Sequence, residues 1–178
     1  MSTPEMMSKS QRRPDAGGAA RTPEGYLLDL DAVDFSRVMV SGDEIAKWNP
    51  HRGPIVQIDG IFWHDEEYRC CVGYKDVRDD EFWVDGHFPG NPVMPGVLII
   101  EAGAQLTSFL FYNRRGGPCV AGFTRIEDTV FRGKVRPGDR LIMLSKEVKY
   151  RPRVFVSALQ GLVDGKIVFE SKITGMVI

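Results

Sequence analysis

The sequence predicts a single α+β domain in which an antiparallel β-sheet wraps around one long, buried helix. Two observations predict this class: one apolar segment near the middle of the chain has the length of a long helix, and four strand-like segments follow it. The chain has 178 residues, which suits one domain with an appendage and a core that needs neither disulfides nor a structural metal.

The central helix is predicted to run from Val97 to Asn113. Nearly every position in this segment is apolar, so the helix should be buried on nearly all sides. Arg114 and Arg115, followed by two glycines, are typical of a helix C-terminus. Prolines and glycines crowd the segment before the helix, residues 87–96, which we therefore interpret as a shaped loop.

Six segments rich in β-branched and aromatic residues are predicted to be strands. They are residues 55–63, 68–74, 119–131, 140–150, 154–163 and 166–177. The first two should form a hairpin, and the Asp164-Gly165 turn predicts an antiparallel hairpin for the last two.

The N-terminal part of the chain is predicted to lie outside the main pattern. Residues 1–24 read as a disordered tail, and residues 25–178 as the domain. Within the domain, residues 25–44 form an N-terminal extension, and the pattern from Tyr26 to Val40 fits either a strand or a helix. Ser41 and Glu44 have the spacing of a capping box, which predicts a short helix from Gly42 to about Trp48.

Charge and composition argue against several classes of protein. With 23 basic and 24 acidic residues the formal charge is -1, whereas binding to nucleic acid or a membrane surface favours a strong field of one sign. No apolar run reaches the roughly 18 residues of a membrane helix. The tail lacks the apolar stretch of a signal peptide, and the three cysteines show no Cys-x-x-Cys spacing. We therefore expect a cytoplasmic protein with no nucleic-acid partner and no membrane insertion.

Glu101 is the residue of the predicted helix that most suggests chemistry, because it is the only charge between His87 and Arg114. It has two interpretations. Either Glu101 lies on a solvent-facing stripe with Gln105, one turn further on, or it is a carboxyl group in apolar surroundings, suited to donate a proton near neutral pH. The sequence leaves both open.

His87, Gly96 and Val97 are the other candidate site residues. A lone histidine is more often structural than catalytic, but the prolines after His87 would hold its imidazole rigidly. Gly96 and Val97 begin the helix, where free backbone N–H groups and the helix dipole favour an oxyanion, although every helix has such an end. A base, an acid and an oxyanion site suit proton abstraction next to a carbonyl, with loss or addition of water.

Other motifs of catalytic or binding sites are missing from the sequence. It has no histidines or cysteines at zinc-ligand spacing, no phosphate-binding glycine loop and no Gly-x-Ser-x-Gly elbow, so we expect no metal. His51 and Arg52 lie in a predicted turn, where the arginine should anchor backbone, and His64 is expected at a solvated loop tip.

The segment from His87 to Gln105 resembles the signature of the β-hydroxyacyl-(acyl carrier protein) dehydratases of fatty acid synthesis. It reads His-Phe-Pro-Gly-Asn-Pro-Val-Met-Pro-Gly-Val-Leu-Ile-Ile-Glu-Ala-Gly-Ala-Gln. The resemblance covers roughly Ile45 to Met176 and includes Pro50-His51-Arg52-Gly53-Pro54 and Pro137-Gly138-Asp139. It implies a hot-dog fold, in which two chains pair into one continuous sheet and the dimers of many members assemble into hexamers.

The resemblance also implies a reaction and roles for the site residues. The enzyme would be a hydro-lyase that converts (3R)-3-hydroxyacyl thioesters on acyl carrier protein to trans-2-enoyl thioesters. His87 would act as the base on the α-carbon, and Glu101 of the partner subunit would handle the hydroxyl group that leaves as water. The amides of Gly96 and Val97 would bind the thioester oxygen. No metal or redox cofactor is implied, since the acyl group arrives on the phosphopantetheine arm of the carrier protein.

Departures from the family pattern keep alternatives open. Glutamate at position 101 is similar to the simple dehydratases rather than to the branch that also isomerises the double bond. Gly53, Gly60, Ala121 and Gly122 stand where the family usually has larger residues. The alternatives are a thioesterase or an isomerising dehydratase on the same fold, and a non-catalytic subunit that binds the acyl carrier.

Overall fold

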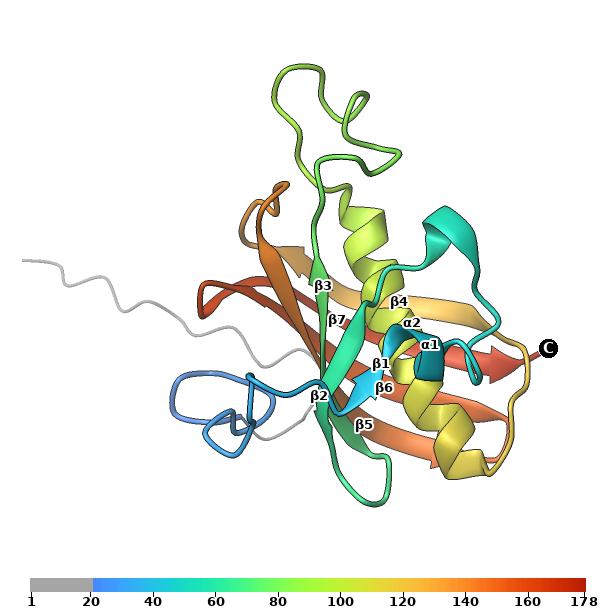
Figure 1. Cartoon of the computed structure of the whole chain (residues 1–178). Helices are drawn as coiled ribbons and strands as arrows, with labels where there is room; N and C mark the ends of the chain where they lie inside the picture. Colours follow the sequence, from blue (N-terminus) through green and yellow to red (C-terminus); the bar gives the residue numbers. More distant parts are fainter. Residues whose placement is uncertain (1–20) are drawn as a thin grey trace, which may run out of the picture.

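A seven-stranded antiparallel sheet packed against one long helix makes up most of the computed structural model, which describes residues 21–178 (Figure 1). The strand order is β1-β2-β3-β5-β6-β7-β4. The strands are β1 (Val40–Ser41), β2 (Gly60–His64), β3 (Cys70–Asp76), β4 (Ala121–Phe131), β5 (Arg140–Arg151), β6 (Val154–Val163) and β7 (Lys166–Val177). The helical elements are α1 (Gly42–Ile45), the 3-10 turn η1 (Gly53–Ile55) and α2 (Gly96–Arg115). The predicted α+β architecture is confirmed.

Helix α2 is the predicted central helix, and it is slightly longer than the sequence pattern indicated. Thirteen of its 20 residues are buried, as expected for a segment that is apolar on nearly every side. Gly103 allows close approach to the sheet, because a Cβ atom there would lie 2.5 Å from the Leu159 side chain of β6. Gly116 ends the helix in a left-handed conformation, and its N–H donates to the carbonyls of Tyr112 and Asn113.

The predicted strands after the helix agree with β4 to β7, and both predicted hairpins, β2–β3 and β6–β7, are present. The strand predicted over residues 55–63 is wrong in its first half, since β2 begins only at Gly60. Part of the backbone in this first half bonds to a side chain: Gln105 accepts from the N–H of Gln57 and donates to the carbonyl of Ile55. The N–H of Asp59 donates to the carbonyl of Tyr74 in β3.

The capping box of Ser41 and Glu44 is confirmed, but α1 is one turn long and stops at Ile45 rather than near Trp48. The extension before it forms only the two-residue strand β1, and its other residues are turns and irregular backbone. The two alternatives considered for this segment, a strand or a helix along its length, are both wrong.

The extension crosses the face of the sheet opposite α2, and Figure 1 shows it beside β2. Its buried residues Leu27, Leu28 and Val33 share a hydrophobic cluster with residues of β2, β3, β5 and β6. The side chain of Gln160, fully buried in β6, accepts from the N–H of Leu27 and donates to the carbonyl of Gly25. The molecule therefore has two apolar layers, one on each face of the sheet.

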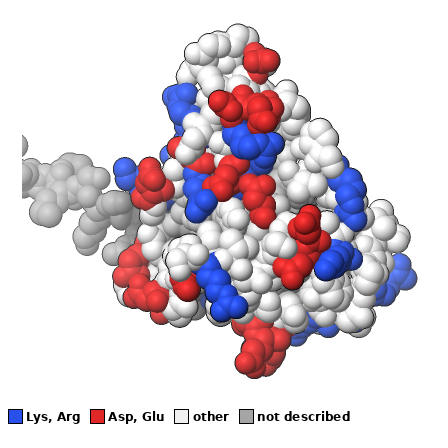
Figure 2. Space-filling model, viewed as in Figure 1, with Lys and Arg blue, Asp and Glu red and all other residues white. Residues whose placement is uncertain are grey.

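The predicted tail, residues 1–24, falls mostly outside the described residues. Its last four residues are described, and Arg21 forms an ion pair with Glu170 of β7. Acidic and basic side chains are interspersed over the face shown in Figure 2, in agreement with the nearly balanced composition. Within residues 21–178, no helix combines the length and apolarity needed to cross a membrane.

Candidate active site

His87 lies on the long loop between β3 and α2, and one hydrogen bond fixes the tautomer of its neutral ring. Its Nδ1 atom lies 2.7 Å from the carbonyl oxygen of Val93. A carbonyl oxygen only accepts hydrogen bonds, so Nδ1 carries the hydrogen and donates it. In the neutral imidazole this leaves the lone pair of Nε2 free. His87 can therefore act as a base through Nε2.

The loop around His87 is held by hydrogen bonds from several directions. The His87 N–H donates to the carbonyl of Trp83 at 2.8 Å, and the N–H of Val93 donates back to the His87 carbonyl at the same distance. Trp83 is itself buried, and its indole N–H donates to Glu81, which forms a buried ion pair with Lys75 at 3.0 Å. In addition to its prolines, the loop therefore has a hydrogen-bond network that ties it to Lys75 of β3.

Glu101 lies on α2 with its side chain 21% exposed, and both of its polar contacts involve one oxygen. Oε1 accepts a hydrogen bond from Gln105 Nε2 at 2.8 Å and lies 3.4 Å from His51 Nε2. Gln105 is buried, at 2% exposure, which argues against a solvent-facing stripe shared by Glu101 and Gln105. The surroundings of Glu101 are polar as well as apolar.

A cavity of about 130 Å³ lies beside Glu101, between α2 and the sheet. Helix α2 contributes Ala104 and Ser108 to its wall, and the start of β4 contributes Ala121 and Gly122. The small side chains at these four positions leave room for a narrow ligand next to the carboxyl group.

Gly96 and Val97 begin α2, as predicted. Pro95 occupies the N-cap position, and no side chain in the described part of the chain caps this end of the helix. The amides of Leu98 and Ile99 are bonded to the Pro95 carbonyl. A Cβ atom at position 96 would lie 2.7 Å from the ring of Phe131, so only glycine lets this ring pack against the helix start.

The structure does not bring all the predicted site residues together within one chain. Among residues 21–178, no hydrogen bond or ion pair joins His87 to Glu101, and the lining of the cavity at Glu101 includes residues of α2, β4 and β6 but not His87. The expectation that the two side chains meet across a dimer interface stays a prediction.

His51 is the residue that sequence reasoning missed. We assigned it to a turn without function, yet it lines the cavity and faces Glu101. The available signal was its place in the upstream motif Pro50-His51-Arg52.

The predictions for Arg52 and His64 have opposite outcomes. Arg52 anchors backbone as predicted, since its guanidinium group donates to the carbonyls of Ala46, Asn49 and His51. His64 is not at a solvated tip: it ends β2, half-buried, and stacks on Tyr68.

Two of the glycines that depart from the family pattern have a structural explanation. At Gly60 a Cβ atom would lie 2.8 Å from the ring of Tyr74 and 3.0 Å from the side chain of Val38, so the N-terminal extension occupies the space of a larger residue. Gly53 has a φ of +68°, a conformation that favours glycine.

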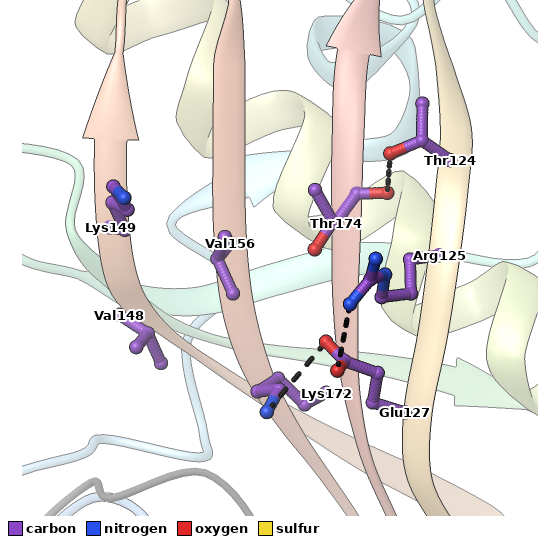
Figure 3. Close-up of a pocket in the computed structure, with 8 residues that line it drawn as sticks. All are labelled: Thr124, Arg125, Glu127, Val148, Lys149, Val156, Lys172 and Thr174. Carbon is purple, nitrogen blue, oxygen red and sulfur yellow. Dashed lines mark hydrogen bonds and ion pairs between the residues drawn. The ribbon is translucent and has the colours of Figure 1, made fainter.

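A larger hollow, of about 540 Å³, lies on the sheet between β4, β5, β6 and β7. Figure 3 shows Glu127 between Arg125 and Lys172, with which it forms ion pairs, while Lys149 lies apart from them on β5. None of the predicted site residues lines it. Within residues 21–178 no three His, Cys, Asp or Glu side chains are grouped as metal ligands would be.

Comparisons with solved structures agree with the hot-dog fold. The dehydratase heterocomplex ApeI:P from Xenorhabdus doucetiae matches with a TM-score of 0.66 at 11% identity, over 80% of this chain and 93% of that one. The uncharacterized protein PH1136 from Pyrococcus horikoshii matches with a TM-score of 0.56 at 14% identity, over 74% and 91%. At these identities the similarity concerns the fold alone.

Sequence comparisons identify the family of this chain. The family model of the FabA-like domain matches residues 49–172. The 3-hydroxyacyl-[acyl-carrier-protein] dehydratase FabZ of Brucella abortus (strain S19) is 39% identical over 130 residues, which cover 72% of this chain and 82% of the relative. FabZ of Clostridium botulinum (strain Loch Maree / Type A3) is 40% identical over 134 residues, covering 74% and 91%. The chain therefore belongs to the FabA-like family, and within it resembles the FabZ-type dehydratases over most of its length.

Proposed function

We propose that this protein is a hydro-lyase that removes water from (3R)-3-hydroxyacyl thioesters carried by acyl carrier protein, giving trans-2-enoyl thioesters in fatty acid or related acyl-chain biosynthesis. The similarity to FabZ dehydratases supports the substrate class. The observation that carries the proposal is the fixed tautomer of His87, whose Nδ1–H is bonded to Val93 and whose Nε2 is free to accept a proton.

In the proposed reaction His87 Nε2 takes a proton from the α-carbon of the substrate. Negative charge then develops on the thioester oxygen, and the amides of Gly96 and Val97 at the uncapped start of α2 stabilise it. Glu101 gives its proton to the 3-hydroxyl group, the C–O bond breaks, and water leaves as the C=C bond forms. The reaction is redox-neutral, so the proposal includes no redox cofactor, and the resemblance to the dehydratases implies no metal.

The proposed assembly is a homodimer joined along β4. This strand is 11 residues long and lies at the edge of the sheet, where it is paired with β7 on one side only. Four of its large apolar residues are exposed, namely Phe123, Ile126, Val130 and Phe131. Such an edge is a template for pairing with another strand. Pairing of β4 with its copy would continue the sheet and bring a second chain beside the cavity at Glu101, and the dimers would assemble further into hexamers.

We also propose acyl carrier protein as the partner that delivers substrate, and the cytoplasm as the location. The three cysteines Cys70, Cys71 and Cys119 are free thiols, which suits a reducing compartment. Burial raises the pKa of Cys70 and Cys71, so these thiols should be unreactive.

Turnover of a 3-hydroxyacyl-carrier substrate tests the proposal. Each of the variants His87→Ala and Glu101→Gln should lower kcat/KM by about 10²-fold or more, because each removes a general base or acid. Near-wild-type turnover by either variant would show that the roles are wrongly assigned. Product analysis should find the trans-2-enoyl thioester alone, whereas free acid or a shifted double bond would indicate a thioesterase or an isomerising dehydratase.

A further inference from the structure

The side chain of Gln105 has only one orientation that satisfies its neighbours, and this orientation determines what Glu101 can do. The backbone N–H of Gln57 donates to Gln105 Oε1 at 2.8 Å, and a backbone N–H can only donate. The other terminal atom of the Gln105 side chain must then be the amide nitrogen, Nε2. It donates to the Ile55 carbonyl at 2.6 Å and to Glu101 Oε1 at 2.8 Å. Oε1 of Glu101 is therefore a hydrogen-bond acceptor.

His51 approaches the same oxygen. Its Nε2 lies 3.4 Å from Glu101 Oε1, while its Nδ1 is buried and has no hydrogen-bond partner among the described residues. If the neutral ring carried its hydrogen on Nδ1, a buried N–H would have no acceptor, which is rare in proteins. With the hydrogen on Nε2, the one donor of the ring is the nitrogen that lies 3.4 Å from Glu101 Oε1.

The main chain fixes the position of His51. The guanidinium group of Arg52 donates to the His51 carbonyl at 2.6 Å and to the carbonyls of Asn49 and Ala46, each at 2.7 Å. The buried side chain of Asn49 donates to the backbone carbonyl of Gln105 at 2.8 Å, which ties this segment to α2. His51 is thus held against the helix that carries Glu101.

We propose that His51 is a positioning residue for Glu101, and that together with Gln105 it determines which carboxyl oxygen carries the acid proton. Between the two forms of the neutral acid, the Gln105 donor and the nearby Nε2–H of His51 favour the one in which Oε1 is the carbonyl oxygen. The proton then lies on Oε2, the oxygen that neither donor contacts, and it is available to a leaving hydroxyl group. The inference rests on the proposed acid role of Glu101.

Steady-state kinetics of the full chain with a 3-hydroxyacyl-carrier substrate test this role. The variant His51→Phe should lower kcat about tenfold, with KM changed by less than about twofold. A misplaced acid slows the chemical step but leaves substrate binding unchanged. The variant His51→Gln, which keeps an N–H donor at the end of the side chain, should recover most of the lost kcat. As a matched control, His64→Phe replaces a histidine that stacks on Tyr68 outside the cavity, and it should keep the wild-type kcat.

A double-mutant cycle separates positioning from a general effect on folding. If His51 acts through Glu101, adding His51→Phe to Glu101→Gln should cause no further loss of kcat. The inference is overturned if His51→Phe keeps the wild-type kcat, if His51→Gln recovers nothing, or if the loss persists unchanged in the Glu101→Gln background. These outcomes differ from failure of the proposed function, in which the wild-type protein does not dehydrate the substrate or Glu101→Gln is fully active.

Discussion

At the scale of single residues, the carboxyl group of Glu170 connects Arg21, at the end of the predicted tail, to the sheet. Glu170 is buried on β7 and forms ion pairs with Arg21 and with Arg132, the latter at 2.6 Å. Burial alone would raise the pKa of Glu170, but the hydrogen bonds and charges of the two arginines outweigh it and hold the pKa below its ordinary value of 4.5. The carboxylate form is therefore favoured in the folded state.

This shift predicts a pH dependence of stability. Because the folded-state pKa of Glu170 lies below the unfolded-state value, its contribution is fully present above about pH 4.5 and is lost as the pH falls through the folded-state pKa. Urea unfolding between neutral and acid pH should show a smaller loss of unfolding free energy for Glu170→Gln than for the wild type. Glu67→Gln, at an exposed position, should follow the wild-type curve. Parallel curves for Glu170→Gln and the wild type would contradict the prediction.

At the scale of elements, the extension is an integral layer of the domain. Leu27 is 3% exposed within the cluster on the face of the sheet opposite α2, so Leu27→Ala should lower the free energy of unfolding by about 2–4 kcal/mol. The exposed Asp31→Ala should change it by less than about 0.5 kcal/mol. Since Glu101 lies on the other face, kcat of Leu27→Ala at a temperature where it is folded should match the wild type. Denaturant titration and turnover assays measure both effects, and an unfolding free energy equal to the wild type would refute this role of the extension.

The elements also show why some features could be predicted and others could not. The central helix and the last three strands have local signals, namely composition, periodicity and turn residues, and their predicted bounds agree closely with the structure. The extension has no regular period, because its apolar residues are placed by contact with a sheet formed later in the chain. The proximity of His51 to Glu101 likewise depends on tertiary contacts between segments 50 residues apart, which no local pattern encodes.

At the scale of the whole molecule, the base and the acid belong to different hydrogen-bond networks of the chain. Within one chain His87 is bonded to Val93, Glu101 is bonded to Gln105, and no hydrogen bond or ion pair joins His87 to Glu101 among the described residues. The exposed apolar edge β4 begins at the cavity beside Glu101, so a second chain paired there would be the nearest source of another His87. In the proposed mechanism the dimer would therefore complete the site as well as bury the edge.

Subunit mixing tests this arrangement directly. Two inactive chains, His87→Ala and Glu101→Gln, are co-expressed with different tags. If each site takes His87 from one chain and Glu101 from the other, a mixed dimer contains one intact site. Half of the dimers from a random mixture are mixed, so about a quarter of the wild-type activity should return. Purification through both tags should raise this to about a half for a free dimer and leave it near a quarter for a hexamer. If both residues of a site came from the same chain, every combination would stay inactive, as would His87→Ala paired with itself as the control.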